Sequence, residues 1–472
     1  MERIESATER SWKLQSGFVL GITFFYLLGQ FIIGPMITTI IGIYLFVVTL
    51  FMLFQIDGFI KYMSIAMFVI GAIILSVKGS SFEIWLQSVS INHTLVALLV
   101  SVPLLGITVK SKQYIEALQQ LYVKYLYNPT IFTAATQLLT HGMAIVLNMG
   151  AVTIFYYLSS NNPVVKQKRF VLTALVRGFA SAIVWSPFFA AMALVTSQLN
   201  LEWSTALPYL FGFVIVSFIV SIIVDLFVQK KQSAMLDSSE EVATTIDEFT
   251  REEVSVNWKK IIELFSLLLA IIGFVFLIDR VTSLTMPTVV ILTAFFFPPI
   301  WLLLKRKYAM LISESKQYVK KTVPLFKKET VLFLTTGFFS GAVSQTNFGN
   351  GLATFLNIIF QDFTIGISLF IAVTIILFSL IGFHPIMLIT LYITSVDPMQ
   401  LGMSKVYYAI LLLGSWGLAT PVSPMTAVSH LLGSLSRIRV FTLSFRWNIL
   451  HCICGLIFLI VYVTFLAKLN VI

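Results

Sequence analysis

The chain has 472 residues, of which 58% are hydrophobic and 11% are charged, against about 25% charged residues in an average soluble protein. This is too little polar surface to cover a soluble globular enzyme, and the composition instead predicts an all-α polytopic membrane protein. The net charge of +10 would suggest nucleic-acid binding in a soluble domain. In a membrane protein it reflects the Lys and Arg excess of cytoplasmic loops, so no nucleic-acid partner is expected.

Apolar runs long enough to cross a bilayer as helices recur along the whole chain. The first 13 residues mix acids and bases without a cleavage-site pattern, so no removable signal peptide is expected. Two stretches, 130–159 and 364–395, are each roughly 30 residues long and are interrupted near the middle. Apart from these, the pattern predicts about 11 membrane-spanning helices, at 15–34, 36–55, 62–78, 93–109, 170–196, 205–228, 261–278, 283–304, 329–346, 405–434 and 446–468.

Lys and Arg gather in alternate loops and leave the other loops nearly free of positive charge. The positive-inside rule puts the basic loops and the basic N-terminal segment in the cytoplasm of a multi-pass protein of the cell membrane. Both flanks of 130–159 are basic, so this stretch is predicted to be a re-entrant hairpin on the cytoplasmic side. The segment 347–362 has no Lys or Arg, so 364–395 is predicted to be a hairpin that enters from outside. A single spanning helix is the alternative for each stretch, and length alone favours it.

Two opposite hairpins indicate two halves of opposite orientation, a common plan of secondary transporters. A shift by half the chain lays 93–196 over 329–434, and each segment then contains an apolar span, a semi-polar amphipathic stretch, a hairpin and a broken span in that order. The stretches 110–128 and 307–326 have the character of arm helices that lie on the membrane. We therefore divide the chain into N-terminal membrane helices (1–92), a first inverted repeat (93–228), a cytoplasmic linker (229–260), membrane helices with an arm helix (261–328), a second inverted repeat (329–434) and a C-terminal membrane helix (435–472).

Helix-breaking residues interrupt the hairpins and the spans that follow them. The first hairpin has its tip at Leu147-Asn148-Met149-Gly150, and the second at Gly382-Phe383-His384-Pro385. Each following span has a Ser-Pro pair at its centre, where proline opens the helix and frees carbonyl groups. Broken helices survive in a membrane only where they line protein or a wet cavity. We therefore predict a substrate site near the bilayer midplane, formed by Asn148, Gly150, Ser186, Pro187, His384, Thr420, Pro421, Ser423, Pro424 and Thr426.

The chemistry of such breaks favours two kinds of ligand. Half-helix N-termini suit an anion such as a carboxylate, and half-helix C-termini and hydroxyls suit Na⁺, which we place near Asn148, Ser186, Thr420 and Ser423. No Asp or Glu falls in the middle of a span, which favours coupling to Na⁺ or to no ion over coupling to protons. His384 keeps proton coupling as an alternative.

Arg177 is a cation well inside the span 170–196. One interpretation is that its side chain extends to the cytoplasmic surface. The other is that Arg177 is a counter-charge for an anionic substrate.

This pattern of hairpins and Thr-Pro and Ser-Pro breaks resembles the ion transporter superfamily, which includes divalent anion–sodium symporters and the membrane subunits of TRAP carriers. The resemblance covers about 93–434 and is carried by the two hairpins, by Ser186-Pro187 and by Thr420-Pro421 with Ser423-Pro424. It implies two inverted halves, a homodimer, and an elevator-like movement of the hairpin-bearing part against a scaffold.

Two functions are compatible with these features. The first is a secondary transporter of a small anionic metabolite, with no enzymatic activity, no catalytic residues and no cofactor other than Na⁺ as a coupling ion. The second is a polytopic membrane enzyme or assembly factor that handles a lipid-linked sugar or polysaccharide. The second class generally needs catalytic groups in a sizeable external loop, whereas the external loops predicted here are short and hold isolated charges.

Overall fold

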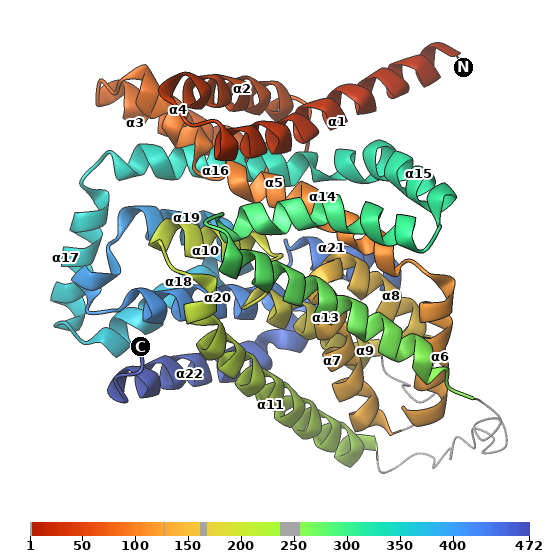
Figure 1. The fold of residues 1–472 in the computed structure, drawn as a ribbon. Helices are drawn as coiled ribbons and strands as arrows, with labels where there is room; N and C mark the ends of the chain where they lie inside the picture. The colour runs from red at the N-terminus through yellow and green to blue at the C-terminus, as the bar shows by residue number, and fades with distance from the viewer. Residues whose placement is uncertain (1, 127, 161–167, 237–254) are drawn as a thin grey trace.

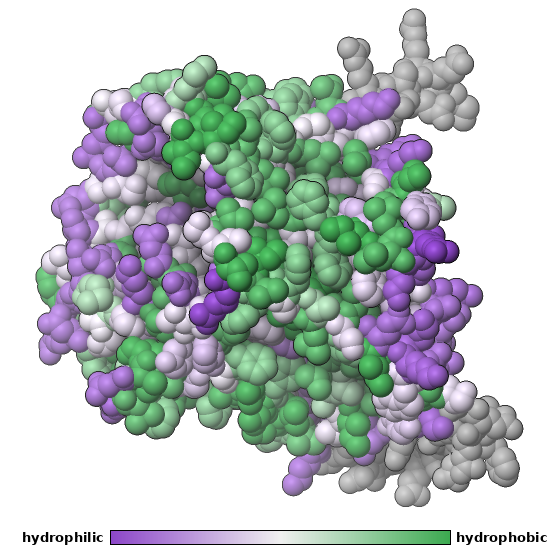
Figure 2. All heavy atoms as spheres, viewed as in Figure 1, coloured by the Kyte–Doolittle hydropathy of each residue, from purple (hydrophilic) through white to green (hydrophobic). Residues whose placement is uncertain are grey.

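The computed structural model describes residues 2–126, 128–160, 168–236 and 255–472, and within these ranges the regular structure is entirely helical. Ten helical segments are long and apolar enough to cross a membrane. Figure 2 shows hydrophilic residues at two opposite sides of the molecule, with a mainly hydrophobic zone between them. These features confirm the prediction of an all-α polytopic membrane protein. The ten segments are Trp12–Phe31, Pro35–Leu53, Phe59–Val77, Phe82–Val109, Pro129–Leu147, Trp203–Lys231, Trp258–Val281, Met286–Leu304, Lys405–Ser436 and Thr442–Lys468.

Two of the predicted spans differ from this set. The span predicted at 170–196 consists of two shorter helices with a break between them, as its Ser-Pro pair indicates. The span predicted at 329–346 is one helix of 18 residues, but its first turn carries Lys327, Lys328 and Glu329, which lowers its hydropathy. Conversely, the first half of the stretch 130–159 is long and apolar enough to count as a span by itself.

The N-terminal helices form one layer at the top of Figure 1, together with helices from the middle of the chain. Within this layer α1 contacts α5, and both α3 and α4 contact α16. The middle of the chain contributes three more helices and two short turns before α16. The bounds are α1 (Glu2–Phe31), α2 (Pro35–Leu53), α3 (Phe59–Val77), α4 (Phe82–Ser90), α13 (Trp258–Val281), α14 (Met286–Leu304), α15 (Tyr308–Gln317), η2 (Tyr318–Thr322) and η3 (Val323–Phe326).

Two runs of helices along the chain have the same order of elements. Each has a helical span, a short amphipathic helix, a pair of helices and then a broken span. The first run comprises α5 (His93–Ser101), η1 (Val102–Val109), α6 (Lys112–Tyr125), α7 (Pro129–Leu147), α8 (Met149–Ser160), α9 (Lys168–Ile183), α10 (Ala190–Leu199) and α11 (Trp203–Leu236). The second comprises α16 (Lys327–Ser344), α17 (Phe348–Phe360), α18 (Thr364–Leu380), α19 (Pro385–Ser395), η4 (Pro398–Leu401), α20 (Lys405–Val422), α21 (Ala427–Ser436), η5 (Thr442–Arg446) and α22 (Trp447–Lys468). The two short amphipathic helices, α6 and α17, lie at opposite edges of the molecule (Figure 1).

The core of the molecule is built around α9 and α20, which contact each other. Every residue from Phe170 to Ile183 of α9 and from Tyr407 to Val422 of α20 is buried. Small residues allow this close approach: a Cβ at Gly417 of α20 would lie 2.5 Å from a methyl group of Val184, just after α9. The two broken spans therefore meet in the centre of the protein. The predicted linker 229–260 lies largely outside the described residues, apart from its ends in α11 and α13.

Candidate functional site

The first predicted hairpin tip is a sharp break between α7 and α8. Asn148 separates the two helices with φ 52° and ψ −131°, a backbone conformation that residues other than glycine rarely adopt. Its N–H donates to the carbonyl of Ala144 at 2.9 Å, and its own carbonyl accepts from the N–H of Ala151 at 3.2 Å. Gly150 is exposed in the first turn of α8. The chain thus reverses at the residue that the sequence indicated.

The first broken span is interrupted between Ile183 and Ala190. Ser186 is fully buried there, and its hydroxyl donates to the carbonyl of Ile145 in α7 at 3.0 Å while it accepts from the N–H of Phe188 at 3.2 Å. Pro187, also buried, has no N–H to donate. The break is therefore fastened to the first hairpin by one serine hydroxyl.

Trp185 and Trp203 make further hydrogen bonds at the same break. The indole N–H of Trp185 lies 3.3 Å from Nε2 of His141, whose Nδ1 lies 2.8 Å from the hydroxyl of Ser181. The indole N–H of Trp203, at the start of α11, donates to the carbonyl of Trp185 at 2.8 Å. His141 is thus engaged through both ring nitrogens.

The second predicted hairpin tip lies between Leu380 and Pro385. Gly382 has φ 111°, a backbone conformation that a side chain would strain. His384 is the N-cap of α19, and its Nδ1 accepts from the N–H of Ile386 at 3.2 Å. Its ring lies against Phe333 and Trp416, with ring centroids 6.2 and 5.9 Å away. The tip of the second hairpin therefore contacts both α16 and α20.

The second broken span is interrupted between Val422 and Ala427. Ser423 is fully buried, and its hydroxyl donates to the carbonyl of Ser379 in α18 at 2.8 Å while it accepts from the N–H of Met425 at 3.3 Å. Thr426 is the N-cap of α21, and its hydroxyl donates to that of Ser429 at 2.8 Å. Thr420 donates within its own helix, to the carbonyl of Trp416 at 2.9 Å. Pro421 lies in the last turn of α20, and Pro424 lies within the break.

Ser186 and Ser423 make equivalent hydrogen bonds in the two runs of helices. The last four carbonyls of a helix have no partner within that helix, and Ile145 and Ser379 lie in the last turns of α7 and α18, three residues before Asn148 and Gly382 respectively. Each serine caps one of these carbonyls from the following broken span, while its oxygen also accepts an N–H two residues ahead. A hydroxyl oxygen has two lone pairs, so one lone pair on each serine remains for another ligand.

Four helices begin at these breaks, namely α8, α10, α19 and α21. The N-terminus of a helix carries partial positive charge and unpaired N–H groups. The halves meet here, because α10 contacts both α19 and α20. The structure therefore brings Asn148 and Ser186 together through α7, and His384, Thr420, Ser423 and Thr426 together around α20. Helix N-termini suit anions, and hydroxyl and carbonyl oxygens suit small cations; the side chains of His384 and Thr426 already cap α19 and α21.

Arg177 lies apart from these breaks and is already neutralised by the protein. Its guanidinium pairs with Asp225 of α11 at 2.9 Å and donates to Ser221 at 3.1 Å and to the side chain of Asn448 of α22 at 2.8 Å. The Arg177 side chain is 2% exposed, so it does not extend to the surface. Its charge is also not available as a free counter-charge for a substrate. Arg177 instead joins α9 to α11 and α22, which sequence reasoning missed because its partners are 44 to 271 residues away.

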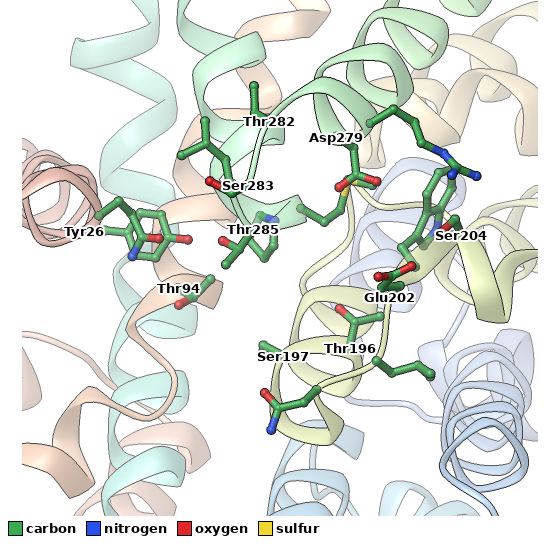
Figure 3. A pocket seen from close by; sticks show the side chains of 18 of the residues that line it. Tyr26, Thr94, Thr196, Ser197, Glu202, Ser204, Asp279, Thr282, Ser283 and Thr285 are labelled. Atoms are coloured by element: carbon green, nitrogen blue, oxygen red, sulfur yellow. The ribbon is translucent and has the colours of Figure 1, made fainter.

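A cavity of about 630 Å³ lies beside the breaks rather than at them. Its walls come from α1, α5, α10 and α14 and from the segments that join α10 to α11 and α13 to α14 (Figure 3). None of the ten predicted substrate-binding residues lines it. Sequence reasoning missed this cavity because its lining comes from four separate stretches of the chain (26–30, 93–94, 196–204 and 279–287) and has no motif. Its polar residues include Tyr26, Thr94, Thr196, Glu202, Asp279 and Thr285.

No known protein-family profile matches the chain, and a search of curated proteins finds no significant relative. The fold and the breaks define the molecule as a multi-pass helical membrane protein with two broken spans at its core. The resemblance to the ion transporter superfamily therefore depends on the order and spacing of the breaks.

Proposed function

We propose that the protein is a secondary transporter that moves a small anionic solute across the cell membrane. The observation that carries this proposal is the set of two hairpin tips and two broken spans, from which four helices start. Each broken span is bonded to its hairpin by an equivalent serine hydroxyl. A structural protein has no need for interrupted helices in its core, because each break leaves backbone groups that must find new partners. Broken helices that converge at the midplane are the usual substrate and ion sites of transporters.

An anion is the substrate class that the four helix N-termini support. A carboxylate at this position would accept hydrogen bonds from the N–H groups at the starts of α8, α10, α19 and α21. It would need no oppositely charged side chain. Na⁺ is the proposed coupling ion, bound by the remaining lone pairs of Ser186 and Ser423 with carbonyls freed at the breaks near Asn148 and Thr420. Proton coupling through His384 is the alternative. The transport cycle then requires no chemical cofactor.

The proposed topology has two inverted halves. The pairs α7–α8 and α18–α19 are re-entrant hairpins from opposite sides, the N-terminus is cytoplasmic, and α6 lies on the cytoplasmic surface. The location of α6 and α17 at opposite edges supports this arrangement (Figure 1). The top layer around α1 to α4 and α16 would be the scaffold, and the resemblance to the superfamily suggests a homodimer with elevator-like movement.

Transport is tested with purified protein in proteoliposomes and a panel of radiolabelled mono- and dicarboxylates, with and without a Na⁺ gradient. We expect accumulation of at least one anion, and we expect Ser186→Ala and Ser423→Ala each to lower its rate. Ser415→Ala is the matched control, since Ser415 is equally buried in α20 but bonds to a carbonyl of its own helix. Accumulation of no anion under either condition would refute the proposal, and equal rates for the three variants would remove the serines from the site.

Topology is tested separately by membrane-impermeant thiol labelling in a background without Cys452 and Cys454. Cysteines at Asn128 and Ser160, at the two ends of the first hairpin, should both react from the cytoplasmic side only. Cysteines at Asp362 and Asp397, which flank the second hairpin, should both react from outside only. Reaction of the two members of either pair from different sides would show a simple crossing instead of a hairpin.

A further inference from the structure

The two arm segments predicted from the sequence pack differently against the protein. In the second segment, no residue of α15 is buried. In the first, α6 is packed against its neighbours through buried Tyr114, Ala117, Leu118 and Tyr122. Figure 1 shows α15 at the same edge of the molecule as α6, and Figure 2 shows hydrophilic residues along this edge. The side chains of α15 are therefore directed largely to the surroundings of the protein.

One face of α15 is apolar and exposed. Tyr308 and Ile312 lie one turn apart on this helix and are 55% and 57% exposed. Leu325, in the turn that leads to α16, is 72% exposed. Contact with water is unfavourable for apolar side chains of this size, whereas a helix that lies in the membrane interface places such a face among acyl chains. Lys316 continues the same face of α15 one turn after Ile312.

The arm also carries a large excess of positive charge. The segment 305–328 contains eight basic residues and one acid. The acid, Glu314, pairs with Lys110 at 2.7 Å, so it leaves the basic residues of the arm uncompensated. Lys305 and Lys328 pair with acids of neighbouring segments. Six residues of the segment make no ion pair within the described part of the chain, namely Arg306, Lys307, Lys316, Lys320, Lys321 and Lys327.

The turn η2 holds two of these lysines beside the start of the first span. The hydroxyl of Ser16 in α1 donates to the carbonyl of Val319 at 2.8 Å, which fixes η2 against α1. The ammonium group of Lys320 lies 5.9 Å from the centroid of the Trp12 ring, and that of Lys13 lies 5.7 Å from it. Tryptophan is enriched at the level of the lipid headgroups. Basic residues from two distant parts of the chain thus gather at one aromatic side chain.

We propose that α15 and η2 bind the headgroup of an anionic phospholipid, whose phosphate pairs with the lysines of the arm and whose acyl chains contact Tyr308 and Ile312. A soluble anion would leave both apolar side chains exposed, whereas a phospholipid covers them and pairs with the lysines at once. The proposed topology puts the arm at the cytoplasmic surface, where clusters of Lys and Arg beside a membrane helix attract anionic lipids. The site shares no residue with the breaks, so it stands or fails independently of the transport proposal.

The test is a lipid titration of the purified full-length protein in detergent micelles, followed by native mass spectrometry. Dioleoylphosphatidylglycerol is the anionic probe. Dioleoylphosphatidylcholine has the same acyl chains without net charge, and glycerol 3-phosphate has the phosphate without acyl chains. We expect the first phosphatidylglycerol to bind more tightly than phosphatidylcholine by a factor of roughly ten or more. Glycerol 3-phosphate at ~1 mM should not displace it, because the acyl chains contribute to binding.

The variants ask whether the lysines of the arm are responsible. Lys320→Gln/Lys321→Gln should lower the affinity for phosphatidylglycerol roughly tenfold or more and leave the affinity for phosphatidylcholine unchanged. Lys230→Gln/Lys231→Gln is the matched control, because it removes the same charge from another adjacent pair of exposed lysines on the same predicted side. It should keep the affinity for phosphatidylglycerol within about twofold. Equal melting temperatures without lipid verify that both variants fold.

Four results would overturn the proposal. The first is equal binding of the two phospholipids by the unaltered protein. The second is unaltered binding of phosphatidylglycerol by Lys320→Gln/Lys321→Gln. The third is a loss in the Lys230→Gln/Lys231→Gln control as large as that in the arm variant, which would reduce the effect to net charge. The fourth is displacement of the lipid by glycerol 3-phosphate, which would indicate a site for a soluble phosphate.

Discussion

The broken spans α9–α10 and α20–α21 are each bonded to the preceding hairpin through a serine hydroxyl. They differ in how they contact α11 and α22. Nine residues before Ser186 the first span has Arg177, and nine residues before Ser423 the second has Gly414. Both positions contact the same two helices. Arg177 binds Asp225 of α11 and Asn448 of α22, whereas a Cβ at Gly414 would lie 2.6 Å from Leu459 of α22 and 3.2 Å from Phe213 of α11.

The comparison shows that the serine bond is common to both halves, whereas the type of contact with α11 and α22 varies. The serine bond to the hairpin occurs in both halves, because both hairpins leave a carbonyl unpaired at the same distance from the tip. This contact anchors the span, and it is an ion pair in one half and close apolar packing in the other.

The largest effect is expected from breaking the anchor of the first span. Arg177→Gln leaves Asp225 buried without its counter-charge, and we expect the unfolding free energy to fall by about 3–5 kcal/mol. Asp225→Asn should do the same to Arg177. The double variant should recover part of this loss, because no unpaired charge remains. Unfolding in denaturing detergent, followed by tryptophan fluorescence, measures all three variants.

The matched change in the second span is Gly414→Ala. The added methyl group overpacks the contact with Leu459, at a cost of about 1–3 kcal/mol. A cost of less than about 3 kcal/mol for Arg177→Gln would contradict the assignment of Arg177 as an anchor. An Arg177→Gln/Asp225→Asn double variant that is no more stable than the less stable single variant would contradict it too.

A smaller effect, equal in the two halves, is expected from the serines. Ser186→Ala and Ser423→Ala each leave a buried carbonyl unpaired, and we expect each to cost about 1–3 kcal/mol of unfolding free energy. The two costs should be nearly additive because the bonds share no atoms. Ser415→Ala should cost less, since the carbonyl of Leu411 keeps its helical N–H partner. If Ser415→Ala costs as much as the other two, the hydroxyl caps have no special role.

The hairpin tips should respond unequally to small substitutions. Gly382→Ala forces a side chain into φ 111°, and we expect it to cost about 1–2 kcal/mol. Asn148→Gly removes a side chain at φ 52° and ψ −131°, a conformation that suits glycine better than Asn, and should leave the unfolding free energy unchanged or raise it by about 1 kcal/mol. Thermal unfolding of the purified variants compares the two. Equal costs would mean that the tips are held by their side chains and not by backbone conformation.

The smallest effect is expected outside both spans, at the exposed pair Asp57–Lys328. The hydrogen bond from Lys328 lowers the pKa of Asp57 in the folded protein. Its stabilising effect is therefore present above the unfolded pKa and is lost as the pH falls through the folded pKa. Asp57→Asn should lower the melting temperature slightly at pH 7, and the difference from the unaltered protein should vanish as the pH falls through the folded pKa of Asp57. A larger change at pH 7 than for Gly382→Ala would be inconsistent with a surface pair.

The positions of the breaks could be predicted from the sequence because Gly, Asn and Pro act locally on the backbone. The stretches 130–159 and 364–395 correspond closely to α7–α8 and α18–α19, and the interruptions fall at Asn148 and at Gly382 to His384. Proline at 187 and at 424 marks the interruptions of the two broken spans. Whether each helix pair re-enters the membrane on one side stays a prediction.

The partners of these residues could not be predicted, because they are distant in the sequence and several are backbone atoms. The carbonyl groups of Ile145 and Ser379 have no signature in the amino-acid type, so the serines could be identified as helix-break residues but not as caps. Arg177 illustrates the same limit for a side chain, since Asn448 is 271 residues away. The cavity near Glu202 and Asp279 arises only when four separate stretches of the chain come together.

The serine caps also set an order on biogenesis. Ser186 is synthesised 41 residues after Ile145, and Ser423 is synthesised 44 residues after Ser379. Each hairpin therefore leaves the ribosome with one carbonyl that nothing in the nascent segment can satisfy. We therefore expect each hairpin and the broken span that follows it to be integrated as a single unit of assembly.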